Sequence, residues 1–178
     1  MTLKPPVSEH DHTAGGPNAR VTLVEYGDYQ CPHCAAAEPV VRSLQKRLGS
    51  ELLFVFRNFP LQEIHPAAEA AAELAEAAAA QQKFWDVHHA IFAWSRKHGP
   101  ESFGTEAFLA IASSVHLDAV AVRDAIADHR YLERIRSDFT SGVRSGVNGT
   151  PTFFIDGRRH DGPFDEDTLS RALAETER

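Results

Sequence analysis

The chain has 178 residues, of which 43% are hydrophobic and 24% charged, enough for one domain with a substantial core. Its net charge of −7 and its lack of a Lys/Arg cluster argue against general nucleic-acid binding. No apolar run approaches the roughly 20 residues needed to span a bilayer, so we expect no membrane insertion.

Residues 1–20 are predicted to form an irregular lead-in, because Pro5-Pro6 and Gly15-Gly16-Pro17 interrupt them. Prolines, acids and histidines stand where a secretory signal has its apolar region. The sequence therefore predicts a cytoplasmic protein, or a periplasmic or other extracytoplasmic one if a leader has been removed. The run His10-Asp11-His12 could chelate a metal weakly, but we expect it to be solvated.

Strand and helix signals then follow one another. Residues 21–26 are nearly continuously apolar, which is typical of a buried central strand. Residues 34–48 have a helical pattern that ends at Gly49, and residues 52–59 form a second strand that ends at Pro60. This order predicts a parallel, right-handed βαβ unit.

Helix signals dominate the next part of the chain. Five helices are expected there, over residues 66–80, 83–94, 105–113, 118–128 and 130–143. We interpret residues 62–145 as an inserted helical domain that packs on the sheet domain. Its large aromatic residues are expected in its core rather than in a substrate site: Phe84, Trp85, Phe92 and Trp94.

Strand signals return near the end of the chain. Thr152–Ile155 is a predicted strand, Asp156-Gly157 a hairpin turn and residues 158–161 the returning strand. Asp165 is expected to cap a last helix. The sheet domain would thus consist of residues 21–61 and 146–178.

Cys31 and Cys34 are the two cysteines of the chain, and they bracket Pro32-His33 at the start of the first predicted helix. A strand that runs through Cys-x-x-Cys into a helix suits thiol–disulfide chemistry. Free N–H groups and the helix dipole favour a thiolate at the helix N-terminus. We therefore expect Cys31 to be the exposed nucleophile and Cys34 the inward-facing resolving cysteine.

Two other interpretations of the cysteine pair are open. Both thiols could be inert and buried, or they could bind zinc. One Cys-x-x-Cys supplies two of the roughly four ligands of a structural zinc site, and the sequence has no second pair. We expect no metal site and no diffusible cofactor, because the cysteine pair would itself be the redox centre.

Four segments carry a family resemblance: Glu25 to Cys34 (EYGDYQCPHC), Arg57 to Leu61 with His65-Pro66, Phe84 to His88 (FWDVH) and Gly146 to Phe153 (GVNGTPTF). They resemble the DsbA-like thiol–disulfide oxidoreductases and lie in the expected order over roughly residues 20–176. The resemblance implies an α/β protein with the thioredoxin-like fold (βαβ + ββα) and an inserted all-helical subdomain.

The same resemblance implies roles for individual residues. Pro32-His33 would tune the redox poise, and Glu25 would accept the Cys34 proton. Thr150-Pro151 would form a cis peptide bond beside the cysteines. The backbone of Thr150 could then pair with an extended substrate chain.

Each of these roles has a structural alternative. His33 could be an ordinary exposed loop residue, Glu25 could form an ion pair at the sheet edge, and Thr150–Pro151 could be trans at a strand start. Asp28 is expected to cap a loop rather than to act in catalysis. If the N–H and the imidazole of His33 donate to the Cys31 thiolate, they stabilise the reduced form and make the disulfide more oxidising.

The sequence thus predicts an enzyme, a thiol–disulfide oxidoreductase that exchanges a Cys31–Cys34 disulfide with protein thiols and leans towards a dithiol oxidase. A cytoplasmic reductase or isomerase is the first alternative, and a non-catalytic redox-sensing or chaperone-like module is the second. Expected partners are protein thiol or disulfide substrates and an unidentified redox partner that resets the pair. The chain is expected to be a monomer.

Overall fold

The computed structural model describes residues 1–176, so the last two residues of the predicted sheet domain lie outside the described part. The elements are, in order, β1 (His12–Gly15), β2 (Val21–Gly27), α1 (Pro32–Leu48), β3 (Leu52–Asn58), α2 (Ala68–Ala79), α3 (Phe84–His98), α4 (Thr105–Ser114), α5 (Ala119–Ala127), α6 (Leu132–Arg144), β4 (Thr152–Ile155), β5 (Arg158–His160) and α7 (Glu166–Glu175). Each predicted strand and helix is present, with shifts of a few residues at the ends. Asp118 and Asp165 cap α5 and α7 as predicted.

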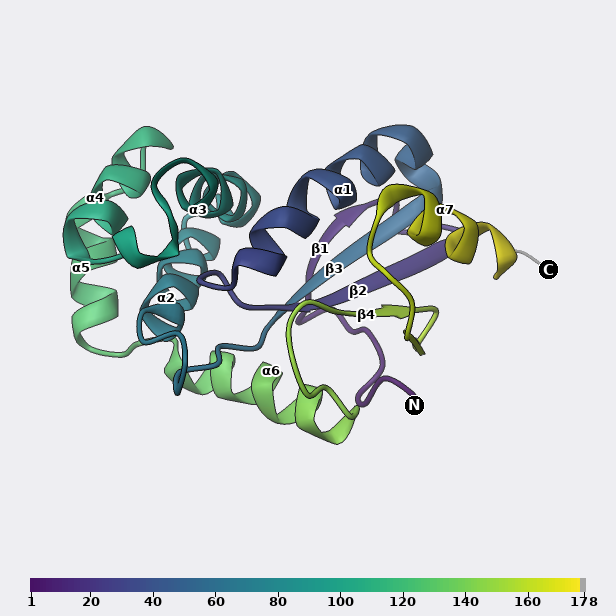
Figure 1. Cartoon of the computed structure of the whole chain (residues 1–178). Coiled ribbons are helices and arrows are strands. Elements are labelled where there is room, and N and C mark those ends of the chain that lie inside the picture. The colour runs from purple at the N-terminus through teal and green to yellow at the C-terminus, as the bar shows by residue number, and fades with distance from the viewer. Residues whose placement is uncertain (177–178) are drawn as a thin grey trace.

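The strands form one sheet in the order β1-β3-β2-β4-β5. β2 and β3 are parallel and joined by α1, whereas β4 runs antiparallel to β2 and β5 antiparallel to β4. In Figure 1, α1 and α7 lie over one face of this sheet and α6 lies under the other. The predicted βαβ and ββα halves are confirmed, and they meet at the central strand β2.

The lead-in is not irregular throughout, and that prediction was wrong for residues 12–15. They form β1, which pairs antiparallel with β3 at the sheet edge and aligns His12 with Phe56. Closer to the N-terminus, the Leu3 N–H donates to the Gly157 carbonyl at 2.8 Å. A four-residue edge strand has too little apolar alternation to give a sequence signal. Its pairing depends on β3, which lies some forty residues further on.

Alternation along β2 divides the core into two clusters. Leu23 packs in the cluster that includes α1, whereas Val24 and Tyr26 pack in the cluster on the other face. Side chains two residues apart on a strand share a face. Glu25 therefore faces the same side as Leu23, towards α1 and the cysteines.

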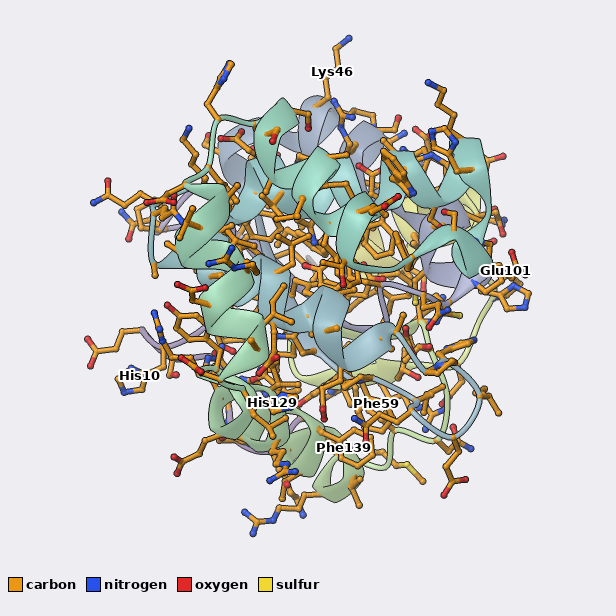
Figure 2. All side chains as sticks on the ribbon, turned by 90° about the vertical axis from the view of Figure 1, so that its left-hand side faces the viewer. His10, Lys46, Phe59, Glu101, His129 and Phe139 are labelled. Carbon is orange, nitrogen blue, oxygen red and sulfur yellow. The ribbon has the colours of Figure 1, made fainter. Side chains whose placement is uncertain are left out.

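α2 to α5 form a helical bundle beside the sheet, at the left of Figure 1. α6 lies within the predicted insertion, and it packs against the sheet as well as against α2 of this bundle. Phe139 of α6 stacks on Phe59 at a centroid distance of 4.3 Å, and Figure 2 shows the two rings side by side. A Cβ at Gly142 would lie 2.6 Å from the Phe59 ring, which shows how closely α6 approaches. Within residues 1–176, no helix is long and apolar enough to cross a membrane.

Arg57 and Asp11 form a buried ion pair that ties the lead-in to β3. Arg57 Nε and Nη2 donate to Asp11 at 2.7 and 3.0 Å, and Nη1 donates to the Tyr26 hydroxyl at 2.9 Å. Nearby, His12 Nε2 lies 3.0 Å from Glu76. The expectation that His10-Asp11-His12 is solvated was therefore wrong for Asp11 and His12. The charged partners of these two residues, Arg57 of β3 for Asp11 and Glu76 of α2 for His12, are distant in sequence.

Asp11→Asn is expected to destabilise the protein by about 3 kcal/mol, because it leaves Arg57 buried with an incomplete ion pair. Burial opposes ionisation of Asp11, yet the hydrogen bonds from Arg57 hold its pKa below the ordinary value. The carboxylate therefore contributes stability above its unfolded pKa, and this contribution is lost as the pH falls. Urea unfolding at pH 7 measures the difference.

The control is Asp124→Asn, which removes an ion pair of 2.8 Å to Arg123 between side chains about half exposed. This variant should lose less than about 1 kcal/mol, since exposed pairs contribute little. An equal decrease in the free energy of unfolding for the two variants would show that burial of the Arg57–Asp11 pair does not increase its contribution to stability.

Candidate active site

The cysteine pair lies where β2 leads into α1. Cys31 is the N-cap of α1 and Pro32 is its first residue, a position that proline favours because it needs no N–H donor there. The Cys31 N–H donates to the Asp28 carbonyl at 3.1 Å, which turns the chain into the helix. Both cysteines are free thiols, so the structure shows the reduced pair.

Cys31 is more accessible than Cys34, but both are buried. Cys31 is 4% exposed and Cys34 is fully buried. The prediction that Cys31 is exposed was therefore wrong, but Cys31 is the more accessible of the two cysteines, as expected. The Thr150 loop covers Cys31, whose Sγ lies 3.4 Å from the Thr150 carbonyl oxygen. The covering loop comes from a part of the chain more than a hundred residues away.

The Cys31 thiolate is stabilised. A hydrogen bond with the Cys34 thiol is the main cause that lowers the pKa of Cys31, to about 5, although partial burial opposes the shift. The Thr150 side chain and then the backbone N–H groups of Cys34 and His33 lower it further. These N–H groups are unpaired in the first turn of a helix and so are available to the sulfur. At pH 7 Cys31 is therefore a thiolate and can act as nucleophile or leaving group.

Cys34 has the opposite protonation preference. Burial, the hydrogen bond to Cys31 and the negative charge of Glu25 raise the pKa of Cys34 well above its ordinary value. The Asp28 N–H, which donates to Cys34 Sγ at 3.4 Å, opposes this shift only in part. The pair therefore holds one proton, and it resides on Cys34.

Glu25 lies under the pair on the central strand. It is 2% exposed, and its Oε1 has no hydrogen-bond partner among the described residues. Burial raises its pKa to about 8, with contributions from the charges of Glu38 and Cys31. The alternative of an ion pair at the sheet edge was wrong, because β2 has a neighbouring strand on each side. No hydrogen bond joins Glu25 to Cys34 within the described residues, so any proton transfer needs a bridging group or a side-chain movement.

The structure shows a backbone contribution from His33 rather than one from its ring. Pro32 and His33 are both exposed. The N–H of His33 reaches the Cys31 sulfur, whereas no contact of the imidazole with Cys31 is recorded in the part of the chain that the structure describes. Tuning of the pair by the imidazole stays a prediction.

The Thr150–Pro151 peptide bond is cis, which is the isomer that the resemblance implies. This loop returns to the cysteines, so that Thr150 and Cys31 are in contact although they lie far apart in sequence. The Thr152 hydroxyl donates to the Gly149 carbonyl at 2.7 Å and closes the turn. The predicted substrate-binding residues therefore lie beside the predicted nucleophile.

Asp28 organises the loop before the cysteines, as expected for a capping residue. Its carboxylate accepts from the Gln30 N–H at 2.7 Å and the Leu61 N–H at 2.8 Å, and it lies 2.8 Å from His65 Nδ1. These contacts join the Cys-x-x-Cys loop to the segment that enters the helical bundle.

Two residues that contact or influence the site were not among the predicted site residues. Glu38, on the buried side of α1, raises the pKa of Glu25, but an acid at an ordinary helical position looks solvated in the sequence. His88 of α3 lies 3.0 Å from the Tyr29 hydroxyl through Nδ1, so the Phe84 to His88 motif contacts the active-site loop. Among residues 1–176, no group of three or more His, Cys, Asp or Glu side chains is arranged to hold a metal ion.

The family profile described as "Thioredoxin" matches residues 7–175. The chain is 42% identical over 165 residues to the Na(+)/H(+) antiporter NhaA 3 of Salinispora tropica, with 93% of the chain and 24% of that protein covered. It is 36% identical to the Na(+)/H(+) antiporter NhaA 1 of Mycolicibacterium gilvum, with 96% and 27% covered. The chain thus spans about a quarter of the length of these curated relatives.

Solved structures share the fold over almost the whole chain. BdbD of Bacillus subtilis superposes with a TM-score of 0.85 at 19% identity, with 99% of this chain and 97% of that chain covered. The thiol-disulfide exchange protein α-DsbA2 of Wolbachia pipientis gives a TM-score of 0.78 at 25% identity, with 95% and 88% covered. The predicted thioredoxin-like fold with a helical insertion is confirmed.

Replacing Cys34 tests the origin of the low Cys31 pKa. Cys34→Ala removes the thiol donor and should move the Cys31 titration midpoint upward from about 5 towards its ordinary value. Cys34→Ser keeps a donor, so its midpoint should lie between those of the wild type and Cys34→Ala. Thiolate absorbance at 240 nm in the reduced proteins gives the three midpoints. A midpoint for Cys34→Ala equal to that of the wild type would exclude the thiol as the main donor.

Glu25→Gln should change the pH dependence of stability. The folded pKa of about 8 exceeds the ordinary value of 4.5, so the folded state holds a proton that the unfolded state has lost between these values. This term lowers wild-type stability as the pH rises from about 4.5 to 8. Unfolding of the reduced proteins should give equal stabilities at pH 4 and an advantage for Glu25→Gln on the order of a few kcal/mol at pH 8.5. A constant difference across this range would contradict the assignment.

Proposed function

This chain belongs to the thioredoxin family and shares the architecture of the DsbA-type thiol–disulfide oxidoreductases, and we propose that it is an enzyme of this type that donates its Cys31–Cys34 disulfide to protein thiols. The observation that carries the proposal is the contrast between the two sulfurs. Cys31 has a pKa of about 5, whereas that of Cys34 is raised well above its ordinary value. A stabilised Cys31 thiolate is a good leaving group and favours the reduced pair, which makes the disulfide oxidising.

The proposed reaction begins with the oxidised pair. A client thiolate attacks Cys31 Sγ, the Cys31–Cys34 bond breaks, and Cys34 leaves and takes up a proton. A second client thiolate then attacks the client sulfur of the mixed disulfide and releases Cys31 as a thiolate. The client loses two electrons to the cysteine pair and gains a disulfide. A redox partner that accepts two electrons must reoxidise the pair.

Glu25 is proposed to serve the protonation of Cys34. Its pKa of about 8 lies near neutral pH, which suits a group that exchanges protons with a buried thiol. Glu25 also raises the pKa of Cys34, so the two groups are electrostatically coupled. The proton would pass from Glu25 as Cys34 leaves and return to Glu25 when Cys34 is reoxidised.

We propose that clients bind as extended chains beside Thr150-Pro151. The Thr150 carbonyl is 3.4 Å from Cys31 Sγ, so a chain that pairs with this loop would carry its cysteine to the nucleophile. Backbone pairing of this kind accepts many sequences, because the main-chain hydrogen bonds supply affinity. Client proteins that present cysteines in unfolded segments therefore fit the site.

The redox potential tests the oxidase direction. Equilibrating the protein with glutathione should give a potential closer to the value of about −120 mV known for DsbA than to the value of about −270 mV known for thioredoxin. A potential near the thioredoxin value would contradict the oxidase proposal and favour a reductase. Cys31→Ser should abolish exchange. In Cys34→Ala the Cys31 thiolate can still attack a client disulfide and release one client thiolate, so this variant should accumulate the mixed disulfide because no second cysteine resolves it.

His33→Ala separates the imidazole from the backbone. The substitution keeps the N–H that reaches Cys31, so any fall in potential measures the ring alone. A lower potential and a higher Cys31 midpoint would support tuning by the imidazole. If neither the redox potential nor the Cys31 titration midpoint changes, the contribution of His33 to thiolate stabilisation comes from its backbone N–H.

The curated relatives suggest one second candidate function. They are named as Na(+)/H(+) antiporters, and the chain matches only about a quarter of each. A domain like this one could therefore sense redox state for an attached transporter without turnover. Full biological activity of a Cys31→Ser variant would favour that role over catalysis. Each candidate function suits a different compartment. An oxidase suits an extracytoplasmic location, whereas a reductase or sensor suits the predicted cytoplasmic location.

A further inference from the structure

The helix that carries the redox pair contains a proline at an internal position. Pro39 lies in the second turn of α1, five residues after Cys34. In an α-helix the N–H of residue 39 would donate to the carbonyl of Ala35, but proline has no N–H. Ala35 follows Cys34 directly and is buried, so its carbonyl needs another donor.

Arg96 supplies that donor from the helical bundle. It belongs to the last turn of α3, and its Nη1 donates to the Ala35 carbonyl at 3.0 Å. The same nitrogen lies 2.8 Å from Oε2 of Glu38, on the next turn of α1. His89, two turns earlier on α3, holds the other oxygen of Glu38 at 2.9 Å through Nδ1. One arginine therefore contacts both the backbone and a buried carboxylate of the redox helix.

We propose that Arg96 is a positioning residue for the redox pair: it replaces the hydrogen bond that Pro39 removes and thereby fixes the first turns of α1, with Cys34, against α3. The inference rests on the proposed redox role of Cys31 and Cys34. It gives the helical bundle a part in setting the chemistry of the pair, in addition to covering one end of the sheet.

The first turn of α1 connects this contact to the nucleophile. The Ala35 N–H donates to the Cys31 carbonyl at 3.1 Å, and the N–H groups of His33 and Cys34 reach the Cys31 sulfur. These donors act only while the turn keeps its geometry, because a hydrogen bond weakens steeply as its angle departs from linearity. The two peptide groups that flank the Ala35 Cα are thus both hydrogen-bonded, one through the Ala35 N–H and the other through the Ala35 carbonyl, which restrains their rotation.

The structure also explains why an arginine suits this position. Its guanidinium carries a permanent charge and a fixed set of donors, so it can hold a carbonyl and pair with a carboxylate at once. A lysine offers a point charge on a flexible stem. Lys97, the next residue along α3, is exposed and makes no recorded contact in the described part of the chain, so it provides a control of equal charge.

The test is a double-mutant cycle between Arg96 and Pro39, with the Cys31 thiolate as the probe. Arg96→Met should raise the titration midpoint of Cys31 by about half a pKa unit or more, roughly a threefold change in the thiolate equilibrium. Lys97→Met should leave it unchanged. Pro39→Ala restores an N–H to Ala35, so Arg96→Met in that background should shift the midpoint by less than half as much. Arg96→Lys should fall between the wild type and Arg96→Met.

Two outcomes would overturn the proposal. One is a shift for Arg96→Met no larger than that for Lys97→Met, and the other is the same shift in both backgrounds, which would mean that Arg96 does not act through Ala35. If Arg96→Met fails to fold by circular dichroism, rescue of folding by Pro39→Ala supports the proposal and failure of rescue contradicts it.

The titration needs neither a client nor a redox partner. A redox potential near that of thioredoxin, combined with the expected smaller midpoint shift in the Pro39→Ala background, would therefore contradict the oxidase proposal and leave the role of Arg96 intact. An oxidising potential, combined with an equal midpoint shift for Arg96→Met in the wild-type and Pro39→Ala backgrounds, would contradict only the role of Arg96.

Discussion

The convergence of hydrogen-bond donors on the Cys31 sulfur is the interaction on which the other features of the site depend. A helix leaves its first N–H groups without partners, and here two of them, with the Cys34 thiol, stabilise one thiolate. This requires β2 to end just before the helix, so that Cys31 becomes the N-cap. The parallel β2–α1–β3 unit provides that arrangement, since the crossover helix starts at the carboxyl end of the central strand.

Two buried acids lie in the same part of the core as the stabilised thiolate. Placing three negative charges there would be unfavourable if all of these groups were ionised. Glu25 faces the pair from the central strand, and Glu38 adds a second carboxylate from α1. Burial and the neighbouring charges keep Glu25 largely protonated near neutral pH. Glu38 stays ionised because, against its burial, His89 and Arg96 lower its pKa. The two acids thus differ in protonation because α3 provides Glu38 with Arg96 and a hydrogen bond from His89, whereas no such partner among the described residues lowers the pKa of Glu25.

The helical bundle is attached to the redox unit at several points. Tyr29 contacts His88, Gln30 accepts from the Ala67 N–H, and Glu38 and Ala35 contact Arg96. These polar contacts lie at the end of the sheet where the cysteines are, beside the bundle in Figure 1. On the opposite face, the Tyr26 hydroxyl lies 2.8 Å from Ser141 Oγ and ties α6 to the sheet. The segments that the chain inserts between β3 and β4 therefore contact the sheet domain on both faces of the sheet.

The sequence by itself determined the order of strands and helices, the cysteine motif and the return of Thr150-Pro151, because each depends on local periodicity or a short motif. It did not reveal β1, the burial of Asp11, the covering of Cys31 or the contacts of Glu38. Each of these depends on a partner distant in the chain: β3, Arg57, Thr150 and Arg96. Burial and pairing are properties of the assembled core, and one local sequence is compatible with either a solvated or a buried charge. Only the tertiary structure decided which acids are neutral, what covers Cys31 and what holds the redox helix in place.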